Sequence, residues 1–177
     1  LPQYGAPMSQ PRILIAGGGK NLGGLVARWW VQEMGGAERT RRVVTLATPH
    51  AGTRSARVAP GPLRAALMPQ GAIVRRLAAG RHRATAVSHT ALVAAADLMV
   101  TPPSSAAALE DADVEWFDGL GHNAMLFDPR VHARVGRRAV VAAEGHHRRR
   151  EQQHPSHLST HPKSSRGAPT PRKATRD

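Results

Sequence analysis

Apolar positions at the start of the chain follow two different periods. Residues 12–16 form a short apolar run that ends in three glycines, which predicts a buried strand entering a sharp turn. After the turn, apolar residues recur at helical spacing, and we expect one inward helix face made of Leu22, Leu25, Val26 and Trp29. Two glycines after Met34 predict the end of this helix. A strand, a glycine-rich turn and a helix together form a unit on which functional sites are built.

The same alternation of strand and helix patterns continues downstream. A β-branched run at 43–47 predicts a second strand, the stretch 83–96 contains a third, and 114–117 reads as a fourth. Between the second and third strands, residues 54–82 hold several prolines and the spacing of one short amphipathic helix, which indicates a lid-like insertion. A short helix opens at Ser104 and Ser105. The pattern predicts an α/β fold with a mainly parallel sheet flanked by helices.

A last helix is predicted from its capping residues. Asp128 is a suitable N-cap, Pro129 occupies the first helical position, and the expected inner face consists of Val131, Val135 and Ala139. We therefore expect the folded domain to cover residues 12–145, with a flexible N-terminus at 1–11 and a tail from 146 onward.

Composition limits the kinds of protein that this chain can be. With 177 residues, 41% of them hydrophobic, there is material for one modest domain. The chain has no cysteine, which excludes disulfides, thiolate catalysis and cysteine-ligated zinc, and we expect no metal site. No apolar run approaches the length that a transmembrane helix needs. None of these features determines the cellular compartment.

The net charge of +13 is partly concentrated in the tail at 146–177. This segment holds eight Lys or Arg and only two acidic residues, and it has almost no large apolar side chains. Because burial cannot offset the entropy of ordering such a segment, we expect the tail to be disordered. It could bind an anionic partner nonspecifically through counterion release, or it could be solvated without a partner.

The glycine-rich turn is compatible with two different chemistries. In the nucleophile elbow G-x-S-x-G, glycines flank a serine; here Gly19 and Gly23 fit the pattern, but Asn21 occupies the serine position. An amide cannot be activated as a nucleophile in the way that a hydroxyl can. Alternatively, backbone N–H groups of such a turn can hold a pyrophosphate at a helix N-terminus.

An acid and a histidine follow the last two predicted strands. Asp97 comes at the end of the third strand, and His122 lies in the loop after the fourth. A nucleophilic hydrolase needs an imidazole to take the proton of the nucleophile and a carboxylate to orient that imidazole. Positions 21, 97 and 122 follow the chain order of nucleophile, acid and histidine that α/β-hydrolases use.

Four segments carry a wider resemblance, namely LGGLVARWWVQEMGG, RRVVTLATPHAGT, DLMVTPPSSA and GLGHNAMLFDPRV. Over residues 22–142 the chain resembles the bacterial triacylglycerol lipase and esterase group of α/β-hydrolases. This resemblance implies a hydrolase that acts on a lipid or a small carboxylic ester without a cofactor. It also implies that Asp97 is the triad acid, that His122 is the base, and that the backbone N–H of Leu22 forms half of the oxyanion hole.

Two departures from this family lead us to expect an inactive or degenerate enzyme. Asn21 replaces the nucleophilic serine, and only residues 1–11 precede the first predicted strand, where the family carries several further strands. We therefore expect an incomplete, truncated α/β-hydrolase fold whose sheet has an unpaired edge.

Two alternatives remain at the sequence level. RILIAGGGKNLGGLVAR resembles the opening of a short-chain dehydrogenase, which implies a nicotinamide dinucleotide held at Gly17, Gly19 and Gly23. The next strand ends in residues 48–50, which offer no carboxylate for the ribose, and no Tyr-x-x-x-Lys pair follows. The other alternative is a non-catalytic chimera in which the two families join through LGGLVAR.

Overall fold

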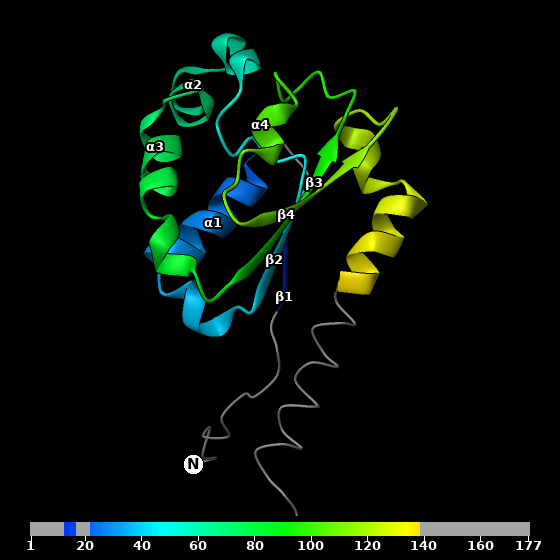
Figure 1. Ribbon diagram of the computed structural model, residues 1–177. Coiled ribbons are helices and arrows are strands. Elements are labelled where there is room, and N and C mark those ends of the chain that lie inside the picture. The colour runs from blue at the N-terminus through cyan, green and yellow to red at the C-terminus, as the bar shows by residue number, and fades with distance from the viewer. Residues whose placement is uncertain (1–12, 17–21, 139–177) are drawn as a thin grey trace, which may run out of the picture.

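A four-stranded parallel sheet forms the centre of the protein. The computed structural model describes residues 13–16 and 22–138. Its strands lie side by side in chain order and are all parallel (Figure 1). They are β1 (Ile13–Ala16), β2 (Arg42–Leu46), β3 (Ser88–Ala94) and β4 (Ala112–Phe117). The predicted α/β architecture, with a parallel sheet flanked by helices, is confirmed.

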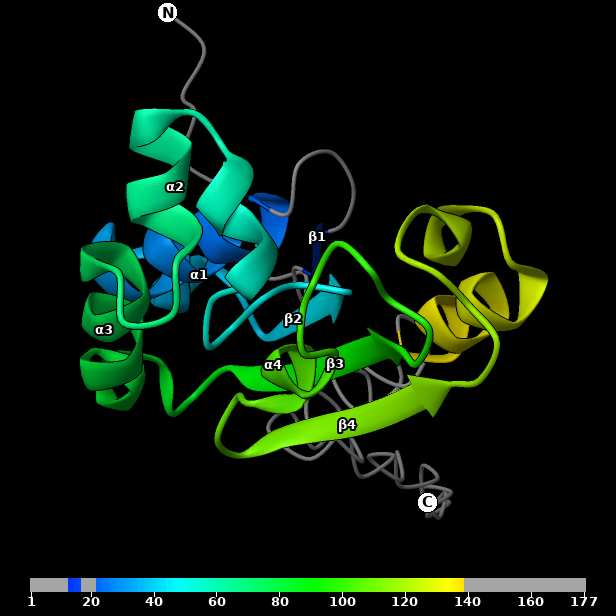
Figure 2. The ribbon, with the colours of Figure 1, turned by 90° about the horizontal axis from the view of Figure 1, so that it is seen from above.

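Helices cover both faces of this sheet. Viewed from above, α1, α2 and α3 lie on one side of the sheet and the helix of residues 129–138 lies on the other (Figure 2). The labelled helices are α1 (Gly23–Glu33), α2 (Gly61–Leu67), α3 (Ala72–Ala79) and α4 (Ser104–Ala107). Four short 3-10 helices are η1 (Gly36–Arg39), η2 (Arg54–Val58), η3 (Arg81–Ala84) and η4 (Asn123–Leu126).

Helix α1 corrects one part of the predicted inward face. Leu25 is buried as expected, but Val26 is 62% exposed. The buried side of α1 includes Val31, which packs against Val43 of β2, together with the polar residues Arg28 and Gln32. Because α1 has α2 and α3 on one side and the sheet on another, Val26 falls on the remaining side. Periodicity alone could not distinguish these sides, because long polar side chains occupy interior positions.

The segment predicted as an insertion is packed against α1. Leu67 of α2 and Leu77 of α3 form a buried cluster with Leu25 and Ala56. The short amphipathic helix expected in this segment is confirmed as α3, which buries Val74 and Leu77. The lid role of residues 54–82 remains a prediction.

The opposite face of the sheet carries the main core. Val44, Leu92, Phe117 and Met125 pack there against Val131 of the helix at 129–138. Asp128 caps this helix as predicted, since its Oδ1 accepts a hydrogen bond of 2.8 Å from the backbone N–H of Arg130. The core therefore fixes the C-terminal loops of β3 and β4 between the sheet and this last helix.

Several predicted features lie outside the described residues. They are the N-terminal segment 1–11, the tail 146–177, Ala139, and the turn residues Gly17, Gly19 and Asn21. Among the helices in the described ranges, none has the length and apolar character needed to cross a membrane.

Candidate functional site

The carboxyl ends of the parallel strands bring two of the predicted site residues, Asp97 and His122, to one edge of the sheet. Strand β1 ends at Ala16 and α1 begins at Gly23, so the connection that contains position 21 leaves the sheet at this edge. The loop at 47–53 follows β2, Asp97 follows β3, and His122 follows β4. Parallel strands present all of these connections on the same side, which is where ligands bind in open α/β sheets.

Asp97 and His122 form a buried hydrogen-bonded pair. Oδ2 of Asp97 lies 2.8 Å from Nδ1 of His122, and the two residues are only 3% and 9% exposed. The other carboxylate oxygen, Oδ1, accepts hydrogen bonds of 2.8 Å from the backbone N–H groups of Met99 and Val100. Because both carboxylate oxygens are held, the Asp97 side chain has one orientation. A carboxylate that accepts from Nδ1 fixes the imidazole with Nε2 free to accept a proton.

Nothing in the described part of the chain engages Nε2 of His122. None of the described serines forms a hydrogen bond with this ring; Ser105, for example, donates instead to the backbone oxygen of Gly52 at 2.5 Å. Among the described residues, no side chain therefore serves as a nucleophile beside His122. Leu22 is the N-cap residue of α1, where backbone N–H groups have no partner within the helix.

The loop after β2 braces the loop that carries Asp97, a role the sequence analysis missed. The hydroxyl of buried Thr53 donates to the backbone oxygen of Met99 at 3.1 Å. It also accepts from the backbone N–H of Thr101 at 2.8 Å, and the backbone N–H of Arg54 donates to the Thr101 oxygen at 2.8 Å. The signal available in the sequence was a threonine that follows a glycine in the loop after the second strand. These bonds connect residues that are 46 and 48 positions apart in the sequence, and they hold the Asp97 loop in place.

Helix α1 approaches this same loop very closely. A Cβ atom at Gly24 would collide with the side chain of Thr48. Thr48 in turn donates to the backbone oxygen of Leu46 at 3.4 Å. Glycine is therefore required at position 24, because it allows α1 to pack closely on the loop after β2. Small residues serve the same purpose in strand-turn-helix sites.

A second buried polar group lies behind the site, between α1 and the sheet. His50 is fully enclosed, with Nδ1 3.3 Å from Nη1 of Arg28 and Nε2 3.0 Å from the hydroxyl of Thr45. An arginine can only donate, so Nδ1 accepts and Nε2 carries the proton that is donated to Thr45. Arg28 also donates to the backbone oxygen of Leu77 at 3.0 Å. Burial, followed by the charges of Arg28 and His89, lowers the pKa of His50 well below its usual value, so this imidazole is neutral.

Strand β3 contributes a second neutral histidine on the amino-terminal side. His89 donates from Nδ1 to the backbone oxygen of Val87 at 2.9 Å, and its buried Nε2 has no partner among the described residues. Burial lowers the pKa of His89 to about 4, and the neighbouring charge of Arg81 acts in the same direction. Burial also lowers the pKa of Arg28 to about 10, with Arg81 adding to the effect.

These lowered pKa values predict that acid destabilises the fold. The unfolded chain binds protons on His89 with an ordinary pKa near 6.5, whereas the folded chain does so only near 4. The stability that His89 contributes is therefore present above pH ~6.5 and is lost as the pH falls toward 4, by about 2 kcal/mol between pH 7 and 5, and the lowered pKa of His50 adds to this loss. Denaturant titrations at both pH values should show this loss in the wild-type protein.

Between pH 7 and 5, the free energy of unfolding of the variant His89→Gln should fall by about 2 kcal/mol less than that of the wild type, because the variant lacks the titrating group. His82→Gln is the matched control, since His82 is exposed, and it should behave as wild type. An unchanged pH dependence in His89→Gln would contradict the assignment.

No cofactor or metal site is evident from the described geometry. The described residues contain no cluster of three potential metal-ligating side chains. Of the glycines that a dinucleotide would need, Gly23 is the first residue of α1, while Gly17 and Gly19 are not described. The end of β2 carries Thr48 and the enclosed His50, neither of which is a carboxylate.

Comparison with known families gave no further guide. No protein-family model matches the chain, and no curated protein matches it significantly. The geometry at the strand ends is therefore the basis for inferring a function.

Proposed function

We propose that this chain carries the site of a carboxylic-ester hydrolase of the lipase or esterase type, in which the nucleophile is replaced by Asn21. The observation that carries the proposal is the buried pair of Asp97 and His122 at the carboxyl ends of β3 and β4. A carboxylate held at both oxygens and bonded to Nδ1 of an imidazole is the arrangement that a nucleophilic hydrolase uses.

The strand order supports the same proposal. Position 21 follows β1, Asp97 follows β3 and His122 follows β4, so the three positions occur in the order that α/β-hydrolases use. The β2 loop lies between them in the sheet and holds the Asp97 loop through Thr53. The loops that carry Asp97 and His122 at the carboxyl ends of β3 and β4, together with this chain order, support a triad along this edge.

In a chain with serine at position 21, each group would have a defined role in catalysis. A serine oxygen at position 21 would attack the ester carbonyl while Nε2 of His122 takes its proton. The imidazolium would then return the proton to the departing alkoxide, and Asp97 would stabilise the positive ring. Backbone N–H groups at the start of α1, including that of Leu22, would bind the oxyanion.

Asn21 prevents this cycle at its first step. The side-chain amide has no hydroxyl that His122 could deprotonate, so no acyl-enzyme can form at this position. We therefore expect the natural chain to bind esters without turning them over by the triad route. A lipid or small-ester partner is consistent with this proposal, and the site requires no cofactor.

Covalent labelling tests this proposal. We expect Asn21→Ser to react with an alkyl phosphonate ester and to gain one phosphonyl group by mass spectrometry, because His122 can then activate the new hydroxyl. The wild-type chain should remain unlabelled. His122→Ala in the Asn21→Ser background should suppress labelling, and His132→Ala, at an exposed histidine, is the matched control.

Two outcomes would count against the proposal. Labelling of the wild-type chain would show that the nucleophile lies elsewhere than position 21. Equal labelling of the Asn21→Ser protein with and without His122 would show that the imidazole does not serve this position.

A further inference from the structure

A second cavity opens on the opposite edge of the sheet, at the amino ends of the strands. Its volume is about 440 Å³, within the size range of small-molecule sites. It spans three neighbouring strands, since Arg42 begins β2, Ser88 begins β3, and Asp111 and Asp113 lie at the start of β4. The register pairs Arg42 with Ser88 and His89 with Ala112. The cavity is therefore separate from the Asp97–His122 edge.

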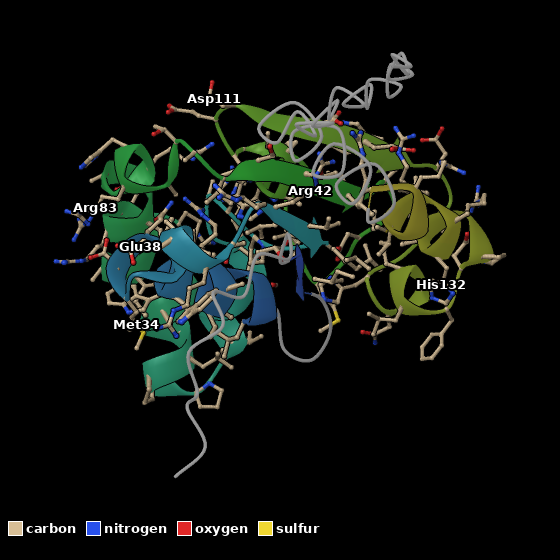
Figure 3. All side chains as sticks on the ribbon, turned by 90° about the horizontal axis from the view of Figure 1, so that it is seen from below. Met34, Glu38, Arg42, Arg83, Asp111 and His132 are labelled. Carbon is tan, nitrogen blue, oxygen red and sulfur yellow. The ribbon has the colours of Figure 1, made fainter. Side chains whose placement is uncertain are left out.

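Basic side chains dominate the walls of this cavity. Arg42, Arg81 and Arg138 line it together with His89, against the carboxylates of Asp111 and Asp113. Asp113 is already paired with Arg138. Figure 3, which views the molecule from below, shows Arg42 near the middle of this face and Asp111 toward its rim. The cavity thus has an excess of positive charge at its centre.

Two of the arginines have no carboxylate partner in the described part of the chain. Arg81 is buried, and its Nε and Nη1 atoms donate only to the backbone oxygens of Glu110 and Ala84, at 3.2 and 3.1 Å. Arg42 forms no side-chain hydrogen bond or ion pair among the described residues. Burial and the nearby charge of Arg138 both lower the pKa of Arg42. A guanidinium group without a carboxylate partner can pair with an anion that enters the cavity.

His89 and three hydroxyl groups also line the cavity. His89 is 3% exposed, and its Nε2 atom has no hydrogen-bond partner among the described residues. This Nε2 atom is closed off from solvent and is the unprotonated acceptor of the ring, so it does not bond a phosphate oxygen. The hydroxyl groups of Ser88, Thr85 and Thr90 line the same cavity and could bond to a polar ligand.

We propose that the cavity at the amino ends of β2, β3 and β4 binds a soluble phosphomonoester, with Arg42 and Arg81 holding the phosphate. The planar fork of a guanidinium matches phosphate oxygens in a bidentate manner. The cavity volume leaves space beyond a single phosphate group, and Asp111 at the rim can accept hydrogen bonds from the remainder of the ligand. This site is independent of the ester hydrolase proposal.

Titrations of the full-length chain with inorganic phosphate and with phenyl phosphate, at constant ionic strength, test this site. Each ligand should raise the melting temperature and perturb the backbone amide resonances of Ser88 and His89 but not those of residues 97–101. Phenyl phosphate should bind at least as tightly as inorganic phosphate. Arg42→Gln should raise Kd about tenfold, which corresponds to about 1.4 kcal/mol.

Arg75→Gln is the matched control, because Arg75 is exposed on α3 and the substitution removes the same charge. Its Kd should equal that of the wild type. Equal weakening in both variants would show diffuse attraction to a basic chain and would overturn the proposal. The absence of amide shifts at Ser88 and His89 in the wild-type protein would overturn it independently of how Arg42→Gln folds. Weaker binding of phenyl phosphate than of phosphate would overturn the assignment to a monoester.

Discussion

In the Asn21→Ser background, Asp97→Asn is expected to lower kcat on a short-chain chromogenic ester by roughly 10⁴-fold. Asparagine can keep the two hydrogen bonds from Met99 and Val100, because its side-chain oxygen can replace Oδ1. Its amide nitrogen, however, would face Nδ1 of His122 as a second donor. The imidazole would then adopt the tautomer with a proton on Nε2, and it could not accept the proton of the nucleophile.

The structure provides a close control for this substitution. Asp118→Asn makes the same chemical change at an exposed residue between β4 and His122, and it should leave kcat within about twofold. Circular dichroism should show that all variants are folded. A decrease of less than tenfold in the Asp97→Asn protein would mean that Asp97 does not orient the base.

The second large effect concerns stability. Leu77→Ala is expected to lower the free energy of unfolding by about 3 kcal/mol, because it leaves a cavity between α3 and α1. Leu77 is fully buried beside Leu25 and Leu67, and its backbone oxygen accepts a hydrogen bond from Arg28. Chemical denaturation monitored by tryptophan fluorescence would measure this change, since Trp29 packs against the same cluster.

Leu98→Ala is the matched control, because Leu98 is exposed in the loop after β3. It should change the free energy of unfolding by less than about 0.5 kcal/mol. The size of the Leu77→Ala effect also bears on the lid hypothesis for residues 54–82. A loss below about 1 kcal/mol would indicate that α3 is only loosely attached, as an opening lid requires. A loss near 3 kcal/mol would identify α3 as part of the core.

Periodicity and capping residues were sufficient to predict most of the secondary structure. The β-branched run at 43–47 predicted β2, and Asp128 with Pro129 predicted the start of the last helix. These signals are local: a strand with two buried faces and a helix cap are each encoded within a few adjacent residues. The order of Asp97 and His122 after successive strands was also readable, because parallel strands present their ends on one edge.

Contacts between distant segments were decided only by the tertiary structure. Val26 continued the apolar spacing of α1, yet it is exposed, whereas Arg28 and Gln32 of the same helix are buried. Nothing near Arg28 in the sequence indicates His50 or the backbone oxygen of Leu77 as its partners. A long polar side chain is buried only where its partners converge, and that convergence depends on how helix and sheet pack.

The two edges of the sheet differ in how much of each site the sequence alone determines. At the carboxyl edge, the sequence by itself determined which residue types follow each strand, since an acid and a histidine at strand ends need no knowledge of packing. Their separation of 2.8 Å and the support from Thr53 required the folded loops. At the amino edge, Arg42, Arg81 and Arg138 come from three separate segments without a shared motif. Only the folded chain brings these three charges to one cavity, because Arg42 begins β2, Arg81 begins η3 ahead of β3, and Arg138 of the last helix pairs with Asp113 of β4.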